Sequence, residues 1–77
     1  MNITIYSTPS CKYCVLAKEY FKEKGLDYIE KDCTDASNKR ELTLLTNQMS
    51  VPVIRIDNDV YIGFQKDKIE EHITSKQ

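Results

Sequence analysis

The chain begins with an alternation of apolar and polar residues that predicts a β-strand. Ile3 and Ile5 alternate with polar neighbours, which supports a strand over residues 2–6. The spacing then becomes helical, because apolar side chains recur every three or four positions over residues 12–24. A proline ends the strand, and Ser10 is expected to cap the helix that follows. The first third of the chain is therefore a strand and a helix joined by a short turn.

A second strand and a second helix follow a glycine. Gly25 stands where the first helix is expected to end, with the left-handed backbone that favours glycine there. Residues 26–31 predict a strand that is less apolar and therefore nearer an edge of the sheet, and residues 36–47 predict a helix. The side chains expected to face inward from that helix and the following loop are Leu42, Leu45 and Met49. Those expected on the solvated side of the first helix are Lys18, Glu19, Lys22 and Glu23.

The rest of the chain predicts a hairpin and a closing helix. Residues 51–56 are the most strand-like stretch, and a tight turn at residues 57–59 leads to a partner strand over residues 60–62. A helix over residues 66–74 closes the chain. The order βαβαββα predicts an α/β fold with a mixed four-stranded sheet, three helices and helices on both faces. We expect residues 1–77 to form one domain.

Composition and charge exclude several classes of function. The chain has 77 residues, of which 40% are hydrophobic and 30% charged, as is typical of a soluble globular protein. The net charge is −1, so nothing favours binding to nucleic acid or to an acidic membrane surface. No apolar run approaches the ~18 residues of a membrane span, and the N-terminus lacks the layout of a signal peptide. We expect a monomeric, cytoplasmic protein that binds neither nucleic acid nor membrane.

Two of the three cysteines carry the candidate chemistry. Cys11 and Cys14 form a C-x-x-C pair within STPSCKYC (residues 7–14), between the first strand and the first helix. The N–H groups of a first helical turn lack partners and the helix dipole favours negative charge there, so a thiolate on Cys11 is stabilised. Cys14 lies about one turn away, close enough to form a disulfide. A stabilised thiolate is also a good leaving group, which is the property of a thiol-disulfide exchange catalyst.

Other interpretations of the cysteines stay open. The pair could be two core thiols, or half of a zinc site that only Cys33 and His72 could complete. Cys33 is expected to be a small apolar residue at a strand end, and the alternative is a third redox thiol. His72 is expected near the end of the last helix, where a positive charge suits the dipole, without a catalytic role. One pair and a single cysteine are not typical of a secreted disulfide framework and favour a reducing compartment.

Three segments of the chain form a set that a known family shares, IYSTPSCKYC (residues 5–14), SVPVI (residues 50–54) and YIGF (residues 61–64). With these segments, and over the whole chain, the sequence resembles a glutaredoxin of the thioredoxin superfamily. The resemblance implies a thioredoxin-like (glutaredoxin) fold and a thiol-disulfide oxidoreductase that reduces protein disulfides or glutathione mixed disulfides. It also implies that Cys11 is the nucleophile and that Cys14 resolves the mixed disulfide.

The resemblance extends to residues around the thiols. In this family the proline of the Val-Pro segment is cis, which would turn the backbone of Val51 toward Cys11 so that it pairs with a peptide-like substrate. Phe64 is expected to serve either the core or the contact with a partner. The substrate-binding residues that the resemblance implies are Thr8, Lys12, Tyr13, Val51, Pro52, Gly63 and Phe64. No metal ligand is assigned, and no tightly bound cofactor is expected, with glutathione as co-substrate.

Departures from the family pattern bear on the electron donor. Typical glutaredoxins have Pro at the position of Lys12, Lys at that of Thr8, and Gly-Gly where this chain has Gly63 and Phe64. Because several of those groups hold glutathione, we expect weak glutathione-linked activity, with a thioredoxin-type reductase as the alternative donor. The closing segment is similar to that of glutaredoxin-like donors of ribonucleotide reductase. Other expected partners are disulfide-containing or glutathionylated proteins such as methionine sulfoxide reductase or a peroxidase.

One of these departures also allows a second class of function. Some glutaredoxins without a proline between the cysteines hold a [2Fe–2S] cluster between two subunits, with glutathione completing the coordination. Lys12 stands in place of that proline. A cluster-binding or carrier protein is therefore the alternative to the oxidoreductase.

Overall fold

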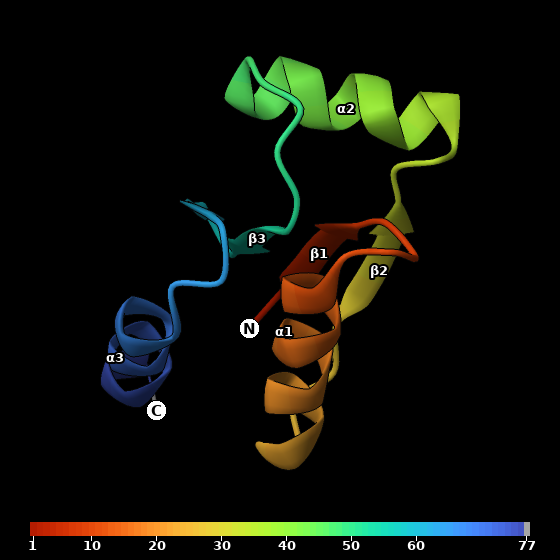
Figure 1. The fold of residues 1–77 in the computed structure, drawn as a ribbon. Helices are drawn as coiled ribbons and strands as arrows, with labels where there is room; N and C mark the ends of the chain where they lie inside the picture. The colour runs from red at the N-terminus through yellow and green to blue at the C-terminus, as the bar shows by residue number, and fades with distance from the viewer. Residues whose placement is uncertain (77) are drawn as a thin grey trace.

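The computed structural model describes residues 1–76, and its order of elements confirms the βαβαββα prediction (Figure 1). The strands are β1 (Ile3–Ser7), β2 (Ile29–Asp32), β3 (Val53–Ile56) and β4 (Asp59–Ile62). The helices are α1 (Lys12–Glu23), α2 (Ala36–Thr46) and α3 (Lys66–Lys76). The strands form one mixed sheet in the order β2-β1-β3-β4, in which β1 pairs with β2 in parallel and with β3 antiparallel. Within the described part of the chain, no helix is long and apolar enough to span a bilayer.

Alternation along the strands sends apolar side chains to both faces of the sheet. Ile5 lies opposite Ile54 on the face covered by α1 and α3, whereas Tyr6 lies opposite Val53 on the face covered by α2 (Figure 1). The larger buried cluster, between the sheet, α1 and α3, consists of Ile3, Ile5, Ala17, Tyr20, Phe21, Ile54, Ile56, Ile69 and Ile73. The smaller one, under α2, consists of Tyr6, Cys33, Leu42 and Val53. The prediction of helices on both faces is confirmed.

The first helix is capped by Cys11, so the prediction of Ser10 is wrong. The backbone of Cys11 is extended (φ −88°, ψ 113°), and its sulfur accepts a hydrogen bond from Cys14 N–H at 3.2 Å. Serine is the stronger capping residue in general, but the turn after β1 places the cysteine at the boundary of the helix. The sulfur with the candidate chemistry therefore also caps the helix.

The end of α2 corrects a second prediction. Leu42 is buried and Leu45 half-buried, as predicted, but Met49 is 48% exposed. The reason is that α2 ends at Thr46 and Asn47 turns the backbone into the left-handed region (φ 60°), so that the helical spacing does not continue. The helical spacing of apolar residues does not hold beyond Thr46, so it predicted an inward orientation of Met49 that the structure does not have.

Two strands begin later than the sequence predicts. β2 starts at Ile29 because Leu26 and Tyr28 pack against the larger cluster from a connection that follows the left-handed Gly25 (φ 69°). β3 starts at Val53, two residues later than predicted. The predicted edge position of β2 and the predicted left-handed glycine are both confirmed.

Candidate active site

The strand register brings distant segments to one end of the sheet. Tyr6 of β1 lies opposite Val53 of β3, so the turn that follows β1 meets the segment that precedes β3. The Val51–Pro52 bond in that segment is cis, as predicted. Gly63, just after β4, donates its N–H to the carbonyl of Pro52 at 2.8 Å and adds a third segment. The predicted site residues come from these three segments and the first turn of α1.

The two thiols of this site have different surroundings. Cys11 is partly exposed at the start of α1, whereas Cys14 is fully buried. The N–H of Cys14 donates to the Cys11 sulfur at 3.2 Å, a contact that is stronger with a thiolate than with a thiol because an anion is the better acceptor. Both cysteines are free thiols in this structure. Substrate can therefore reach Cys11 directly, while Cys14 is screened from solvent.

The buried position also sets the protonation state of Cys14. Burial, followed by the hydrogen bond between the two thiols, raises the pKa of Cys14 to about 12. A backbone N–H of Thr8 and the positive charge of Lys18 act in the opposite direction. Cys14 is therefore protonated at neutral pH.

The other candidate residues near Cys11 lie on the turn after β1 and on the first turn of α1, and they differ in exposure. Thr8 is half-buried, and its carbonyl accepts a hydrogen bond from Cys11 N–H at 3.3 Å. Lys12 and Tyr13 occupy the first turn of α1 and face solvent, with Tyr13 61% exposed. An exposed ring two residues from a reachable sulfur offers a surface for a substrate to contact.

The candidates on the other two segments differ in what they expose. Pro52 is buried, while Val51 is half-buried and, among residues 1–76, its backbone N–H and C=O have no hydrogen-bond partner. Those two groups are free to pair with an extended peptide. The rings of Phe64 and Tyr20 pack in an edge-type arrangement, with 5.7 Å between centroids. It also lines, with Leu16, a groove of about 300 Å³ between α1 and the start of α3, so it serves both the core and the surface.

Sequence reasoning did not find a polar cluster beside Cys14. Lys18 Nζ pairs with a carboxylate oxygen of Glu30 at 2.6 Å, and the buried hydroxyl of Ser7 donates to the same oxygen at 3.0 Å. The Lys18 side chain is only 21% exposed, so its predicted place on the solvated side is wrong. The available signal was spacing, because residues four apart on a helix are neighbours and Lys18 follows Cys14 by four.

Cys33 lies apart from the two reactive thiols. It is buried under α2, on the opposite face of the sheet from α1. Burial, followed by the charge of Asp32, raises the pKa of the Cys33 thiol. This environment confirms the prediction of a small apolar residue at a strand end.

His72 also lies outside the site. On α3, its Nδ1 is 2.8 Å from the Tyr61 hydroxyl and 3.2 Å from a carboxylate oxygen of Asp59. These contacts join α3 to β4, which is a structural role. Over residues 1–76, no three His, Cys, Asp or Glu side chains gather in a way that could hold a metal ion.

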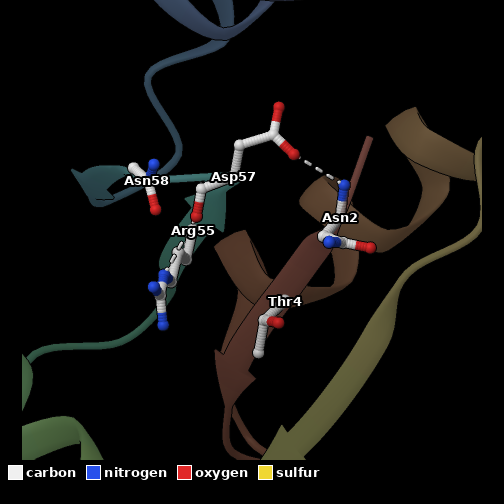
Figure 2. Close-up of a pocket in the computed structure, with 5 residues that line it drawn as sticks. All are labelled: Asn2, Thr4, Arg55, Asp57 and Asn58. Atoms are coloured by element: carbon white, nitrogen blue, oxygen red, sulfur yellow. Dashed lines mark hydrogen bonds between the residues drawn. The ribbon is translucent and has the colours of Figure 1, made fainter.

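A cavity of about 430 Å³ lies at the other end of the sheet (Figure 2). Asp57 reaches across it to the start of β1, where the N–H of Asn2 donates to its carboxylate at 2.9 Å. The cysteines follow the carboxyl end of β1, so this cavity is separate from the dithiol site. The residues that line it are Asn2, Thr4, Arg55, Asp57 and Asn58, none of which is a predicted site residue.

Comparison with solved structures defines the class of protein. The thioredoxin-like protein BC3987, solved as its T8A mutant, matches with a TM-score of 0.85 at 33% identity, over 92% of this chain and 97% of that one. NrdH-redoxin from Escherichia coli, a glutaredoxin-like protein with a thioredoxin-like activity profile, matches with a TM-score of 0.79 at 24% identity, over 92% and 93%. The fold is therefore thioredoxin-like, as the sequence predicts.

Comparison with sequences then gives the family. The glutaredoxin family model matches residues 3–61. A glutaredoxin-like 8.6 kDa protein of the Clostridium pasteurianum rubredoxin operon is 42% identical over 72 residues, which cover 92% of this chain and 96% of that protein. The chain belongs to the glutaredoxin family.

Proposed function

We propose that this protein is a thiol-disulfide oxidoreductase that reduces protein disulfides or glutathione mixed disulfides. The observation that carries the proposal is the unequal environment of two thiols one helical turn apart. Cys11 is reachable and accepts an N–H hydrogen bond at the start of α1, while Cys14 is buried and protonated. Membership of the glutaredoxin family supports the same class of reaction.

The reaction consists of two thiol-disulfide exchanges. The Cys11 thiolate attacks one sulfur of the substrate disulfide, whose S–S bond breaks and whose second sulfur leaves as a thiolate. Cys14 then loses its proton and attacks the Cys11 sulfur, which forms the Cys11–Cys14 disulfide and releases the first substrate sulfur. Two electrons pass to the substrate, and an external reductant returns the protein to the dithiol.

The unpaired backbone N–H and C=O groups of Val51 are the proposed binding site for the substrate chain. They would pair with the chain that flanks the substrate disulfide, as an added strand does at a sheet edge. Tyr13 would cover the other side of the attacked sulfur. In a reducing cytoplasm, the proposed substrates are disulfide-containing or glutathionylated proteins such as ribonucleotide reductase, methionine sulfoxide reductase or a peroxidase.

We further propose that glutathione is a weak reductant of this protein and that a thioredoxin-type reductase is a better one. Thr8 stands where the family pattern has a lysine, and Phe64 where it has a second glycine. A lost charge-assisted hydrogen bond removes about 1.5–3 kcal/mol in a partly buried site and less at an exposed one. Even the lower figure corresponds to about a tenfold loss of affinity.

Two coupled assays test both proposals. NADPH oxidation is followed with glutathione and glutathione reductase in one cuvette, and with thioredoxin reductase in the other, on the same disulfide substrate. We expect turnover in both, faster with thioredoxin reductase, and lost in Cys11→Ser but kept in Cys33→Ser. Failure to turn over in either cuvette would contradict the oxidoreductase. Faster turnover with glutathione would contradict only the proposed donor.

A further inference from the structure

The second exchange requires a thiolate at a buried position. Cys14 is fully buried, so water does not solvate a charge on its sulfur. Taking a charge out of water is unfavourable unless a nearby group compensates for it. A resolving cysteine in this position therefore needs a specific partner within the protein.

The polar cluster formed by Ser7, Lys18 and Glu30 lies where such a partner is needed. Lys18 follows Cys14 by one helical turn, on the same face of α1. Its ammonium is fixed by Glu30 of β2 at 2.6 Å, and Ser7 of β1 donates to the same carboxylate oxygen at 3.0 Å. Residues of three elements thus fix one positive charge one helical turn from the buried thiol, and that charge lowers the pKa of Cys14.

The first exchange changes which groups act on Cys14. In the dithiol form, Cys11 raises the pKa of Cys14 through a hydrogen bond and through its charge. In the mixed disulfide the Cys11 sulfur carries neither a proton nor a charge, so both effects end. Burial still raises the pKa of Cys14, while the Thr8 N–H and Lys18 still lower it. These last two groups are then the ones that favour ionisation of Cys14 against the effect of burial.

We propose that Lys18, anchored by Glu30 and Ser7, stabilises the Cys14 thiolate during the second exchange. The proposal rests on the proposed oxidoreductase function and deepens it. Cys14 releases its proton to solvent and attacks the Cys11 sulfur; the bond between Cys11 and the substrate sulfur breaks, and that sulfur leaves with the electron pair. Lys18 touches neither substrate nor the breaking bond, so it acts through Cys14 as a positioning residue.

The other charged groups around the cluster act mainly on Glu30 and Lys18. The hydrogen bond from Lys18 lowers the pKa of Glu30, and the nearby Asp32 raises it. The Glu30 carboxylate in turn raises the pKa of Lys18, with a smaller contribution from Tyr28. Lys18 therefore stays charged throughout the pH range of the exchange. Glu30 reaches it from β2, whereas Lys18 and Cys14 share a helix face.

A two-phase thiol release separates the two exchanges. The reduced protein, in excess, is mixed with 2,2′-dithiodipyridine, an uncharged disulfide whose released thiopyridone absorbs light. The first phase reports attack by Cys11 and scales with protein concentration. The second reports attack by Cys14 within the same molecule and does not. Rates are measured by stopped flow from about pH 4 to pH 8, where formation of the Cys14 thiolate limits the second phase.

We expect Lys18→Met to slow the second phase about threefold and to leave the first unchanged. Removing the positive charge raises the pKa of Cys14, and an about tenfold loss of thiolate, of which higher nucleophilicity restores about threefold, gives that net effect. The pH profile of the second phase should also move to higher pH. Lys18→Arg, which keeps the charge and the pairing with Glu30, should restore both the rate and the profile.

Lys22→Met is the matched control, because it removes an exposed charge from the same helix one turn further on. A second phase that is unchanged in Lys18→Met, or equally slowed in Lys22→Met, would overturn the proposal. If Lys18→Met does not fold, Lys18→Gln carries the same expectation. A wild-type protein that releases thiol in a single phase, without NADPH turnover, would instead refute the proposed function itself.

Discussion

At the scale of single residues, the sulfur of Cys11 replaces the oxygen that usually caps a helix. Cys11→Ser keeps an acceptor for the Cys14 N–H, whereas Cys11→Ala removes it. We expect both variants to lose disulfide reduction but only the alanine variant to lose stability, by about 1 kcal/mol. In a domain of this size that corresponds to a melting temperature lower by roughly 4–8 °C. Thermal melts of the two variants side by side measure it, and equal melting temperatures would contradict the capping role.

Cys14 gives a second prediction at this scale. Cys14→Ser removes the resolving thiol, so the first exchange should stop at a mixed disulfide between Cys11 and the substrate sulfur. Mass spectrometry after incubation with a disulfide-containing protein should find one covalent adduct per chain, which dithiothreitol releases. The reciprocal variant, Cys11→Ser, is the control and should form none. An adduct on Cys14 in that control would reverse the two roles.

The contact between the Tyr61 hydroxyl and the His72 ring gives a third prediction at the scale of single residues. The hydroxyl lies 2.8 Å from Nδ1 of a histidine side chain that is only 7% exposed. Tyr61→Phe should therefore destabilise the fold by about 1–2 kcal/mol, since it leaves a buried ring nitrogen with one partner fewer. Tyr13→Phe removes an exposed hydroxyl and should change stability by less than about 0.5 kcal/mol. Urea unfolding of both variants tests this difference, and equal unfolding midpoints would contradict the prediction.

At the scale of elements, strong periodic patterns were predictable, whereas the course of the chain just beyond them was not. Ile3 and Ile5 alternate cleanly, and Leu42 falls on the helical stripe, so their strand and helix follow from the sequence. Met49 was misplaced because the helical spacing does not say where a side chain of the following loop points. The course of the chain after α2 depends on a left-handed Asn47, a conformation that several residue types adopt.

The residues of the candidate site likewise divide into those that the sequence predicts and those that it does not. Cys11 and Cys14 were predictable because spacing and position carry their chemistry locally. Lys18 was not, because its burial depends on Glu30 of β2 and Ser7 of β1, which reach it only through the sheet. Contacts between elements distant in sequence leave no local periodic signal.

The left-handed residue at the end of α2 supports a prediction at the element scale. Asn47 has φ 60° and ψ 22°, and its N–H donates to the carbonyl of Thr43 at 2.7 Å. Asn47→Gly should raise the free energy of unfolding by a few tenths of a kcal/mol, and Asn47→Ala should lower it by about 1 kcal/mol. Denaturant titrations of the three proteins test this order. An alanine variant as stable as the glycine variant would contradict it.

At the scale of the whole molecule, the two faces of the sheet are held differently. The face under α1 and α3 has the larger apolar cluster, whereas α2 adds polar contacts to the smaller one. Glu41 of α2 accepts from Lys31 Nζ at 2.7 Å and from the Tyr6 hydroxyl at 3.1 Å. One carboxylate thereby joins α2 to β2 and β1.

That carboxylate makes part of the stability dependent on pH. The hydrogen bond from Lys31 lowers the pKa of Glu41 below its usual value. A carboxyl with a lower pKa in the folded state stabilises the fold above its unfolded pKa and loses that effect as pH falls through the folded one. Glu41→Gln should therefore lower the melting temperature at pH 7, and the difference from wild type should shrink as pH falls below about 4.3 and vanish below the lowered folded pKa. The side chain is 44% exposed, so the shift should be small.

Thermal melts over this pH range measure the effect, with Glu19→Gln as the control. Glu19 is exposed and, within the described residues, has no ion pair. Its variant should follow the wild-type curve at every pH. A Glu41→Gln difference that stays constant with pH would show that the carboxylate charge does not contribute.

The positions of the chain ends bear on how the molecule can be attached to something else. β1 starts at the end of the sheet away from the Cys11 turn, and α3 contacts the end of α1, where Lys24 pairs with Glu70; both labelled termini lie away from that turn in Figure 1. A group attached at either described end of the chain therefore lies away from the two thiols. A flexible linker fused at either end could hold the protein to a reporter or to a second enzyme at millimolar effective concentration without blocking the cysteines.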